Sequence, residues 1–169
     1  MNRHPGGEEH TRRMAELSGL APGSVILDMG AGAGETVRLL TALGYAVRGI
    51  DLAPRGENVE SGDMLHTPYK DGSFDGIISQ CAFFVSGDAA AALGEAHRLL
   101  RPGGVLMLSD VWFEDAGEAV RGAGFEVLCR EDMTAAWREY YIEAIWRGDA
   151  ACVPVKGKCT YQMLICKKE

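Results

Sequence analysis

The stretch Val25-Ile26-Leu27-Asp28-Met29-Gly30-Ala31-Gly32-Ala33-Gly34-Glu35-Thr36 decides the fold of this chain. Its short apolar run is typical of a buried strand, and a helical pattern of apolar residues that begins at Val37 follows the glycines directly. The glycines let the backbone turn sharply and approach a ligand, because no Cβ stands in the way. Free amides at the start of a helix favour an acceptor or anionic group. The stretch therefore predicts a strand, a ligand-binding turn and a helix.

The spacing of the glycines indicates which ligand the turn binds. A dinucleotide-binding turn has the pattern G-x-G-x-x-G, but Glu35 stands where the third glycine of that pattern belongs. Asp28 lies two residues before the first glycine, where a carboxylate can face a cationic group directly or through water. A ligand with an amino group therefore fits this turn better than a pyrophosphate.

Together these residues resemble the first motif of the class I S-adenosylmethionine-dependent methyltransferases, a hydrophobic strand followed by D-x-G-x-G-x-G. Asp51 ends a second apolar run about twenty residues after the first glycine, the offset at which an acid reaches ribose hydroxyls. Gly62-Asp63-Met64 resembles the family's G-D-x motif, and residues 70–75 and 95–104 resemble the segments before its fourth and fifth strands. The chain is most similar to the compact group of ubiquinone and menaquinone C-methyltransferases, known as methyltransferase type 11.

This resemblance implies an α/β fold of the Rossmann-like class I methyltransferase type. Its sheet has seven mostly parallel strands in the order 3-2-1-4-5-7-6, and its last strand is antiparallel. Only eleven residues separate Asp51 from Asp63, so we expect a reduced second helix and third strand. The expected strands begin at Val25 and span 46–50, 58–60, 74–80, 105–109, 125–129 and 160–166, and the expected helices span 8–17, 88–100, 114–123 and 134–146, besides the one after the glycines.

The implied cofactor is S-adenosylmethionine. By position in the family motifs, Asp28 holds its amino group, the glycine turn its methionine part, Asp51 its ribose, and Asp63 with Met64 its adenine. The complete set of expected cofactor-binding residues is Asp28, Gly30, Ala31, Gly32, Gly34, Asp51, Leu52, Asp63, Met64 and Gln80.

The catalytic residues are unknown from sequence, and none is strictly required, because the methyl group of a sulfonium is already activated. If the acceptor needs deprotonation, His10, His66 and Asp110 are candidate bases, and none of them is assigned. Phe83 and Phe84 belong either to the core or to the acceptor pocket, and Cys81 is a further candidate for that pocket.

The composition of the chain limits which domain organisation and which partners are possible. With 169 residues and 47% hydrophobic content, we expect a single domain: an N-terminal helical lid segment (1–22), a cofactor-binding core (23–110) and C-terminal strands and helices (111–169). A helix that merely covers the sheet is the alternative to the lid. A net charge of −7 without a basic run predicts a small-molecule acceptor and no nucleic acid. We expect a cytoplasmic protein with no membrane partner, because neither a spanning segment nor an apolar signal region is present.

The cysteines and histidines predict no metal site. The five cysteines form no C-x-x-C pair, and the four histidines show no ligand spacing. Cys129 and Cys166 fall in expected strands as small buried residues, whereas Cys152 and Cys159 stay unassigned. The last helix carries Trp137, Tyr140, Tyr141 and Ile145, and most of its aromatic residues are expected in the core.

Two alternative functions stay open. The short segment between Asp51 and Asp63 allows a protein that binds S-adenosylmethionine without catalysis. A nicotinamide-dependent oxidoreductase on a related fold is disfavoured by Glu35. The identity of the acceptor, the methylated atom, the oligomeric state and the pathway do not follow from the sequence.

Overall fold

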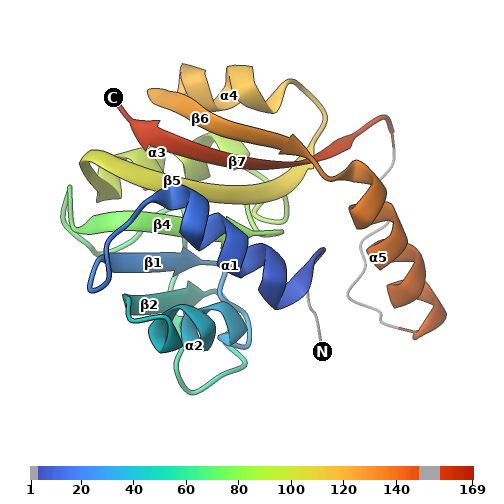
Figure 1. The fold of residues 1–169 in the computed structure, drawn as a ribbon, viewed down its shortest axis with the longest axis horizontal. Coiled ribbons are helices and arrows are strands. Elements are labelled where there is room, and N and C mark those ends of the chain that lie inside the picture. Colours follow the sequence, from blue (N-terminus) through green and yellow to red (C-terminus); the bar gives the residue numbers. More distant parts are fainter. Residues whose placement is uncertain (1–3, 149–156) are drawn as a thin grey trace.

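Apolar runs in the sequence form the centre of a seven-stranded sheet in the computed structural model, which describes residues 4–148 and 157–169 (Figure 1). The strands lie in the order β3-β2-β1-β4-β5-β7-β6, which confirms the predicted fold. All neighbouring strands are parallel except that β7 is antiparallel to both β5 and β6. The strands are β1 (Val25–Met29), β2 (Ala46–Asp51), β3 (Glu60–Ser61), β4 (Phe74–Gln80), β5 (Leu100–Trp112), β6 (Phe125–Asp132) and β7 (Thr160–Lys168).

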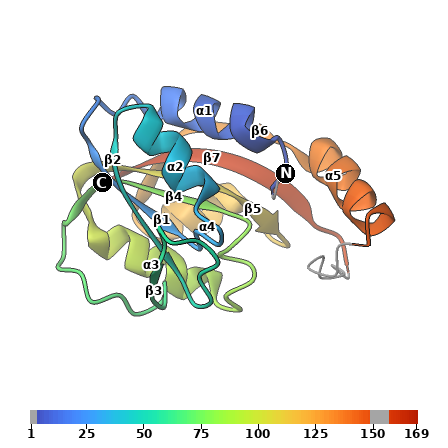
Figure 2. The same ribbon diagram turned by 90° about the horizontal axis from the view of Figure 1, so that it is seen from below.

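Helices cover both faces of the sheet, as a parallel sheet of buried strands requires. Helix α1 and helix α3 lie on opposite faces (Figure 2). One core cluster joins Met14 of α1 and Leu40 of α2 to the sheet, and the other joins Leu93 of α3 and Val120 of α4 to it. The helices are α1 (Gly7–Ser18), α2 (Glu35–Ala42), α3 (Ala89–Leu99), α4 (Ala116–Gly122) and α5 (Thr134–Trp146).

The connection between β2 and β3 is shortened, as predicted. Residues 52–59, all of which the structure describes, contain no helix and instead lie along the glycine turn. The backbone amide of Arg55 donates to the carbonyl of Gly32 at 2.9 Å, and the Asn58 amide group donates to the carbonyl of Gly34 at 3.2 Å. β3 begins at Glu60 rather than at Asn58, because the Asn58 side chain is used to fasten the connection to the turn.

The start of β5 differs from the prediction. It begins at Leu100 rather than at Val105, so the expected turn over 101–104 lies within the strand. Phe74 pairs with Leu100, but Gly76 pairs with Val105, so the intervening residues of β5 form a bulge. The exposure of 101–103 agrees with the expected turn, and the pairing of Leu100 explains why the strand extends past it.

The prediction that most of the aromatic side chains of α5 lie in the core is wrong, because Trp137, Tyr140 and Tyr141 are only half-buried. Only Ala144 of this helix is buried, whereas Ile145 is 59% exposed and Trp146 is 85% exposed. The helix extends beyond the end of the sheet, and Trp137 stacks on Tyr161 of β7 with an interplanar angle of 6° (Figure 1). Because little of α5 lies over the sheet, its outer apolar residues have no core to enter.

The remaining cysteine and loop predictions have mixed outcomes. Cys166 is buried in β7, as predicted, and Cys129 of β6 is only half buried. Cys152 and most of the loop expected over 148–158 lie outside the described residues. Within the part of the chain that the structure describes, no helix has both the length and the apolar character needed to cross a membrane.

Gly49→Ala is expected to lower the free energy of unfolding by about 1–3 kcal/mol, because overpacking a close-packed site forces its neighbours to move. A Cβ on Gly49 of β2 would lie 2.7 Å from Val37 and 2.8 Å from Ala31. Gly94→Ala in α3 is the matched control, because nothing lies within 4 Å of its added Cβ. The free energy of unfolding of Gly94→Ala should rise by about 0.5–1 kcal/mol, because alanine has a higher helix propensity than glycine. Urea unfolding measures both, and equal effects would contradict the prediction.

Candidate active site

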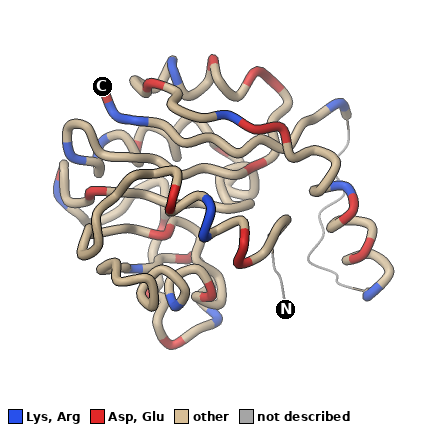
Figure 3. Tube along the Cα trace, in the orientation of Figure 1, with Lys and Arg blue, Asp and Glu red and all other residues tan. Residues whose placement is uncertain are grey.

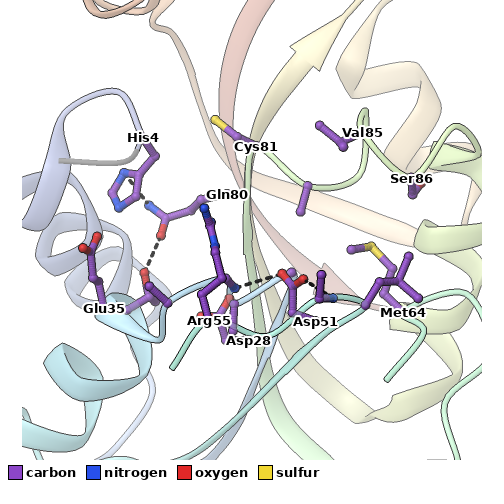
Figure 4. Close-up of a pocket in the computed structure, with 18 of the residues that line it drawn as sticks. His4, Asp28, Glu35, Asp51, Arg55, Met64, Gln80, Cys81, Val85 and Ser86 are labelled. Carbon is purple, nitrogen blue, oxygen red and sulfur yellow. Dashed lines mark hydrogen bonds between the residues drawn. The ribbon is translucent and has the colours of Figure 1, made fainter. Parts of the chain in front are cut away.

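A cavity of about 550 Å³ lies at the carboxyl ends of β1, β2 and β4 (Figure 4). Ligands of open α/β sheets bind at this edge, next to the point where the strand order reverses. The structure brings together in this cavity every residue predicted from the sequence to bind the cofactor, except Gly34. The predicted residues that line it are Asp28, Gly30, Ala31, Gly32, Asp51, Leu52, Asp63, Met64 and Gln80.

The glycine turn after β1 requires glycine for two physical reasons. Gly30, Gly32 and Gly34 have φ values of 86°, 54° and 76°, in the left-handed region that side chains disfavour. A Cβ on Gly30 would overlap Ala82, and one on Gly34 would overlap Asn58. Gly34 is the N-cap residue of α2, and it is not among the residues that line the cavity. Its close contact with Asn58 shapes the turn.

Asp28 places a buried carboxylate at the cavity. Its side chain is 3% exposed, and its Oδ2 atom has no hydrogen-bond partner among the described residues. Burial, together with the nearby charge of Asp51, raises the pKa of Asp28 to about 7. A buried carboxylate oxygen without a partner is costly, and a cationic hydrogen-bond donor on a ligand would satisfy it.

Asp51, the last residue of β2, and Asp63, two residues after β3, hold the loops around the cavity. The two oxygens of Asp51 accept hydrogen bonds from the amides of Gly32 and Ala53, both at 2.9 Å. Asp63 accepts a hydrogen bond from the amide of Leu65 at 2.9 Å. The other acceptor positions on these carboxylates stay available to hydroxyl or amino groups in the cavity.

Gln80 connects the end of β4 to both helices on the α1 face. Its Oε1 accepts hydrogen bonds from Thr11 of α1 at 3.3 Å and from Thr36 of α2 at 3.0 Å. Its Nε2 lies 3.4 Å from Nδ1 of His4, which also lines the cavity. No sequence pattern predicts that His4 lies at the cavity, because its position depends on how α1 packs on the sheet.

Helix α1 covers the sheet, and the chain just before it reaches the cavity. Met14 is fully buried in the core, whereas Leu17, which the sequence also marks as apolar, is 41% exposed. Nε2 of His10 forms a hydrogen bond with the hydroxyl of Ser109 at 2.9 Å. The structure therefore supports the covering role for the helix itself and places His4 at the cavity.

None of the three candidate bases lines the cavity. Asp110 is 1% exposed and accepts hydrogen bonds from four backbone amides, those of Val111 and of residues 82–84. Burial raises the pKa of Asp110 to about 6 and lowers that of His10 to about 4. His66 is exposed beside Asp63. Asp110 thus fixes the backbone of the segment after β4. None of the three candidate bases is positioned to act on a ligand in the cavity.

The segment after β4 contributes one strained residue to the cavity. Cys81 has a φ of 56°, and its sulfur lies 3.1 Å from the hydroxyl of Tyr161. Burial raises the pKa of Cys81 to about 12, so the thiol stays protonated at neutral pH. Phe83 is fully buried in the core, and Phe84 packs on Phe113 with 5.7 Å between ring centroids. Neither phenylalanine is among the residues that line the cavity.

The charge of the cavity differs from that of the chain around it. Lys and Arg are interspersed with Asp and Glu along the described trace (Figure 3). The cavity lining, in contrast, contains four acidic residues, Asp28, Glu35, Asp51 and Asp63, and one arginine, Arg55. Arg55 was not predicted to line the cavity. The only feature of the sequence that could have indicated it is the short connection between β2 and β3 that contains this residue. The arrangement suits a ligand that carries positive charge.

Comparison with known proteins identifies the family. Residues 27–108 match a protein family described as "Methyltransferase domain". This chain resembles the methyltransferases of that family and has the class I methyltransferase fold. The predicted resemblance is confirmed, and S-adenosylmethionine is supported as the cofactor, because solved methyltransferases that share the fold hold S-adenosylmethionine or S-adenosylhomocysteine. Among the described residues, no group of His, Cys, Asp or Glu side chains could hold a metal ion.

The individual relatives of this chain differ in their acceptors. A sarcosine/dimethylglycine N-methyltransferase from Halorhodospira halochloris is 39% identical over 76% of this chain and 61% of its own length. A demethylmenaquinone methyltransferase from Tropheryma whipplei is 32% identical over 61% of this chain and 48% of its own. The chain thus spans about half the length of the curated relatives it matches. The [4+2]-cyclase SpnF shares the fold, with a TM-score of 0.77, 21% identity and coverage of 99% of this chain and 84% of that one.

Asp28→Asn is expected to stabilise the ligand-free protein above about pH 7, because the amide carries no charge for burial to penalise. In the parent, the pKa of Asp28 is raised from 3.8 to about 7, so the folded state keeps a proton that the unfolded chain releases. The contribution of Asp28 to the free energy of unfolding is therefore fully present below about pH 4. It falls by a few kcal/mol, in order of magnitude, as the pH rises to about 7.

Urea unfolding of parent and variant at about pH 4 and about pH 8 measures this difference. The exposed Glu16→Gln of α1 is the control, and it should show no such pH-dependent gain. A variant that is less stable than the parent at the higher pH would contradict the burial of an uncompensated charge at Asp28.

Proposed function

We propose that this chain is an S-adenosylmethionine-dependent methyltransferase that transfers a methyl group to a small-molecule acceptor by in-line displacement. The observation that carries this proposal is the buried Asp28 carboxylate, which lines the cavity beside the glycine turn and whose Oδ2 atom has no hydrogen-bond partner in the part of the chain that the structure describes. An amino group is the natural partner for a carboxylate in that position. The glycine turn beside it leaves room for the methionine part of the same ligand.

The other lining residues fit the rest of the cofactor. Asp51 would hold the ribose hydroxyls, since its oxygens face the cavity at the end of β2. Asp63 and Met64 would hold the adenine, with Leu52 packing against the same end of the ligand. Gln80, fixed by Thr11 and Thr36, would border the methionine part.

The chain's contribution to the reaction is binding and orientation. When bound, the cofactor supplies a methyl group that its positively charged sulfur has already activated. Holding an acceptor in line with that methyl group contributes up to about 7 to 11 kcal/mol in favourable cases. We assign no catalytic base, because the three candidates lie outside the cavity lining.

The acceptor is proposed to enter at the side of the cavity formed after β4. Figure 4 shows Cys81, Val85 and Ser86 across the cavity from Asp28 and Asp51. This side is mostly uncharged, and the cavity volume of about 550 Å³ is that of a small-molecule site. A small acceptor therefore fits better than a macromolecule.

Calorimetric titration is expected to show binding of S-adenosylmethionine and S-adenosylhomocysteine and no binding of NAD. Ligand binding should also raise the melting temperature, since a hundredfold excess over Kd adds about 2.7 kcal/mol of stability. Asp51→Asn should weaken binding of both adenosyl compounds about tenfold, because it removes a charged acceptor for the ribose hydroxyls. Glu16→Gln is again the control, since this side chain is exposed on α1.

Two results would decide against the proposal. Binding of NAD without the adenosyl compounds would favour an oxidoreductase. Binding of S-adenosylmethionine without release of S-adenosylhomocysteine, across a panel that includes sarcosine, dimethylglycine and demethylmenaquinone, would favour a protein that binds the cofactor without catalysis.

A further inference from the structure

The shortened connection after β2 places one cation in an otherwise acidic cavity. Arg55 is the only lysine or arginine among the residues that line it, against four acidic side chains. Other arginines of the described chain, such as Arg98 and Arg101, form ion pairs with neighbouring carboxylates. No ion pair or side-chain hydrogen bond of Arg55 is found with any described residue, so its guanidinium is free to bind a ligand.

The position of Arg55 is fixed by the glycine turn itself. Its backbone amide donates to the carbonyl of Gly32 at 2.9 Å. Gly56 is packed so closely on the carbonyl of Ala33 that a Cβ there would overlap it, and Asn58 bonds to Gly34. The connection is therefore fastened to the turn at successive positions, and its first attached residue is Arg55.

The guanidinium of Arg55 lies directly over the turn. Its Nη2 atom is 3.0 Å from the point that a Cβ on Gly32 would occupy. Figure 4 shows the side chain extending into the cavity from the vicinity of Asp28 and Asp51 toward Gln80. Asp28 and Arg55 thus offer a negative and a positive group at one end of the cavity, on either side of the glycine turn.

We propose that Arg55 binds the carboxylate of the cofactor's amino-acid part and thereby makes the site selective for cofactors that carry this carboxylate. This inference rests on the proposed function. An α-amino acid carries its ammonium and its carboxylate on the same carbon atom, so a ligand whose ammonium meets Asp28 presents its carboxylate close by. A guanidinium donates two parallel hydrogen bonds to a carboxylate, and this geometry makes Arg well suited to such a partner.

The test compares two ligands that differ only in this carboxylate: S-adenosylhomocysteine and its decarboxylated analogue. Calorimetry with Arg55→Gln should show about a tenfold loss of affinity for S-adenosylhomocysteine, as expected for one lost hydrogen-bonded charge pair. Affinity for the decarboxylated analogue should be unchanged. Arg12→Gln, a matched change of an exposed arginine on α1, should alter neither affinity.

Each other outcome overturns the inference in a distinct way. Equal loss for both ligands would mean that Arg55 shapes the turn or contacts the adenosyl part, and no loss for either would mean that it does not bind the cofactor. An unchanged cofactor affinity with a raised KM for a carboxylate-bearing acceptor would assign Arg55 to the acceptor. Failure of the parent protein to bind either ligand would instead overturn the proposed function. The unfolding midpoint of Arg55→Gln should equal that of the parent, because the side chain is exposed and forms no ion pair with a described residue.

Discussion

The end of β2 holds the glycine turn, and the rest of the site depends on this attachment. The carbonyl of Ile50 accepts hydrogen bonds from the amides of Gly30 and Ala31, and Asp51 accepts one from Gly32. The same Asp51 carboxylate also accepts the amide of Ala53, at the start of the shortened connection. The turn after β1 and Asp51 at the end of β2 are thus fixed relative to each other by hydrogen bonds that backbone amides donate, without a helix between β2 and β3.

The shortened connection joins β2 to β3 without the helix that would otherwise lie between these strands. Ordering each backbone residue of such a loop costs about 1–2 kcal/mol. The bonds from Arg55 to Gly32 and from Asn58 to Gly34 offset this cost, and Val59 is buried at its end. Because the loop lies against the ligand-binding turn rather than on a sheet face, its side chains are close enough to the cavity for Arg55 to enter it.

The sequence predicted the parts of the molecule that depend on local patterns and family motifs. The bounds of β4 and α5 agree with the prediction, because turn or capping signals border both elements. The predicted burial of the α5 aromatic residues was wrong, because burial depends on the elements against which a helix packs, and α5 extends past the sheet. His4 and Arg55 were missed for the same reason: no local pattern states that α1 or a short loop carries a side chain to the cavity.

Asp28 and Asp110 show how a ligand site differs from a structural use of the same residue. Both are almost fully buried near the ends of β1 and β5, the two strands that flank β4, and burial raises the pKa of each. Asp110 recovers part of the cost of burial from four backbone amides, and its pKa rises only to about 6. Asp28 keeps an oxygen without a hydrogen-bond partner among the described residues and has a pKa of about 7. One buried carboxylate is thus satisfied by the chain itself, whereas the other is left open at a cavity, and this difference supports the proposal that a cationic group of the ligand binds Asp28.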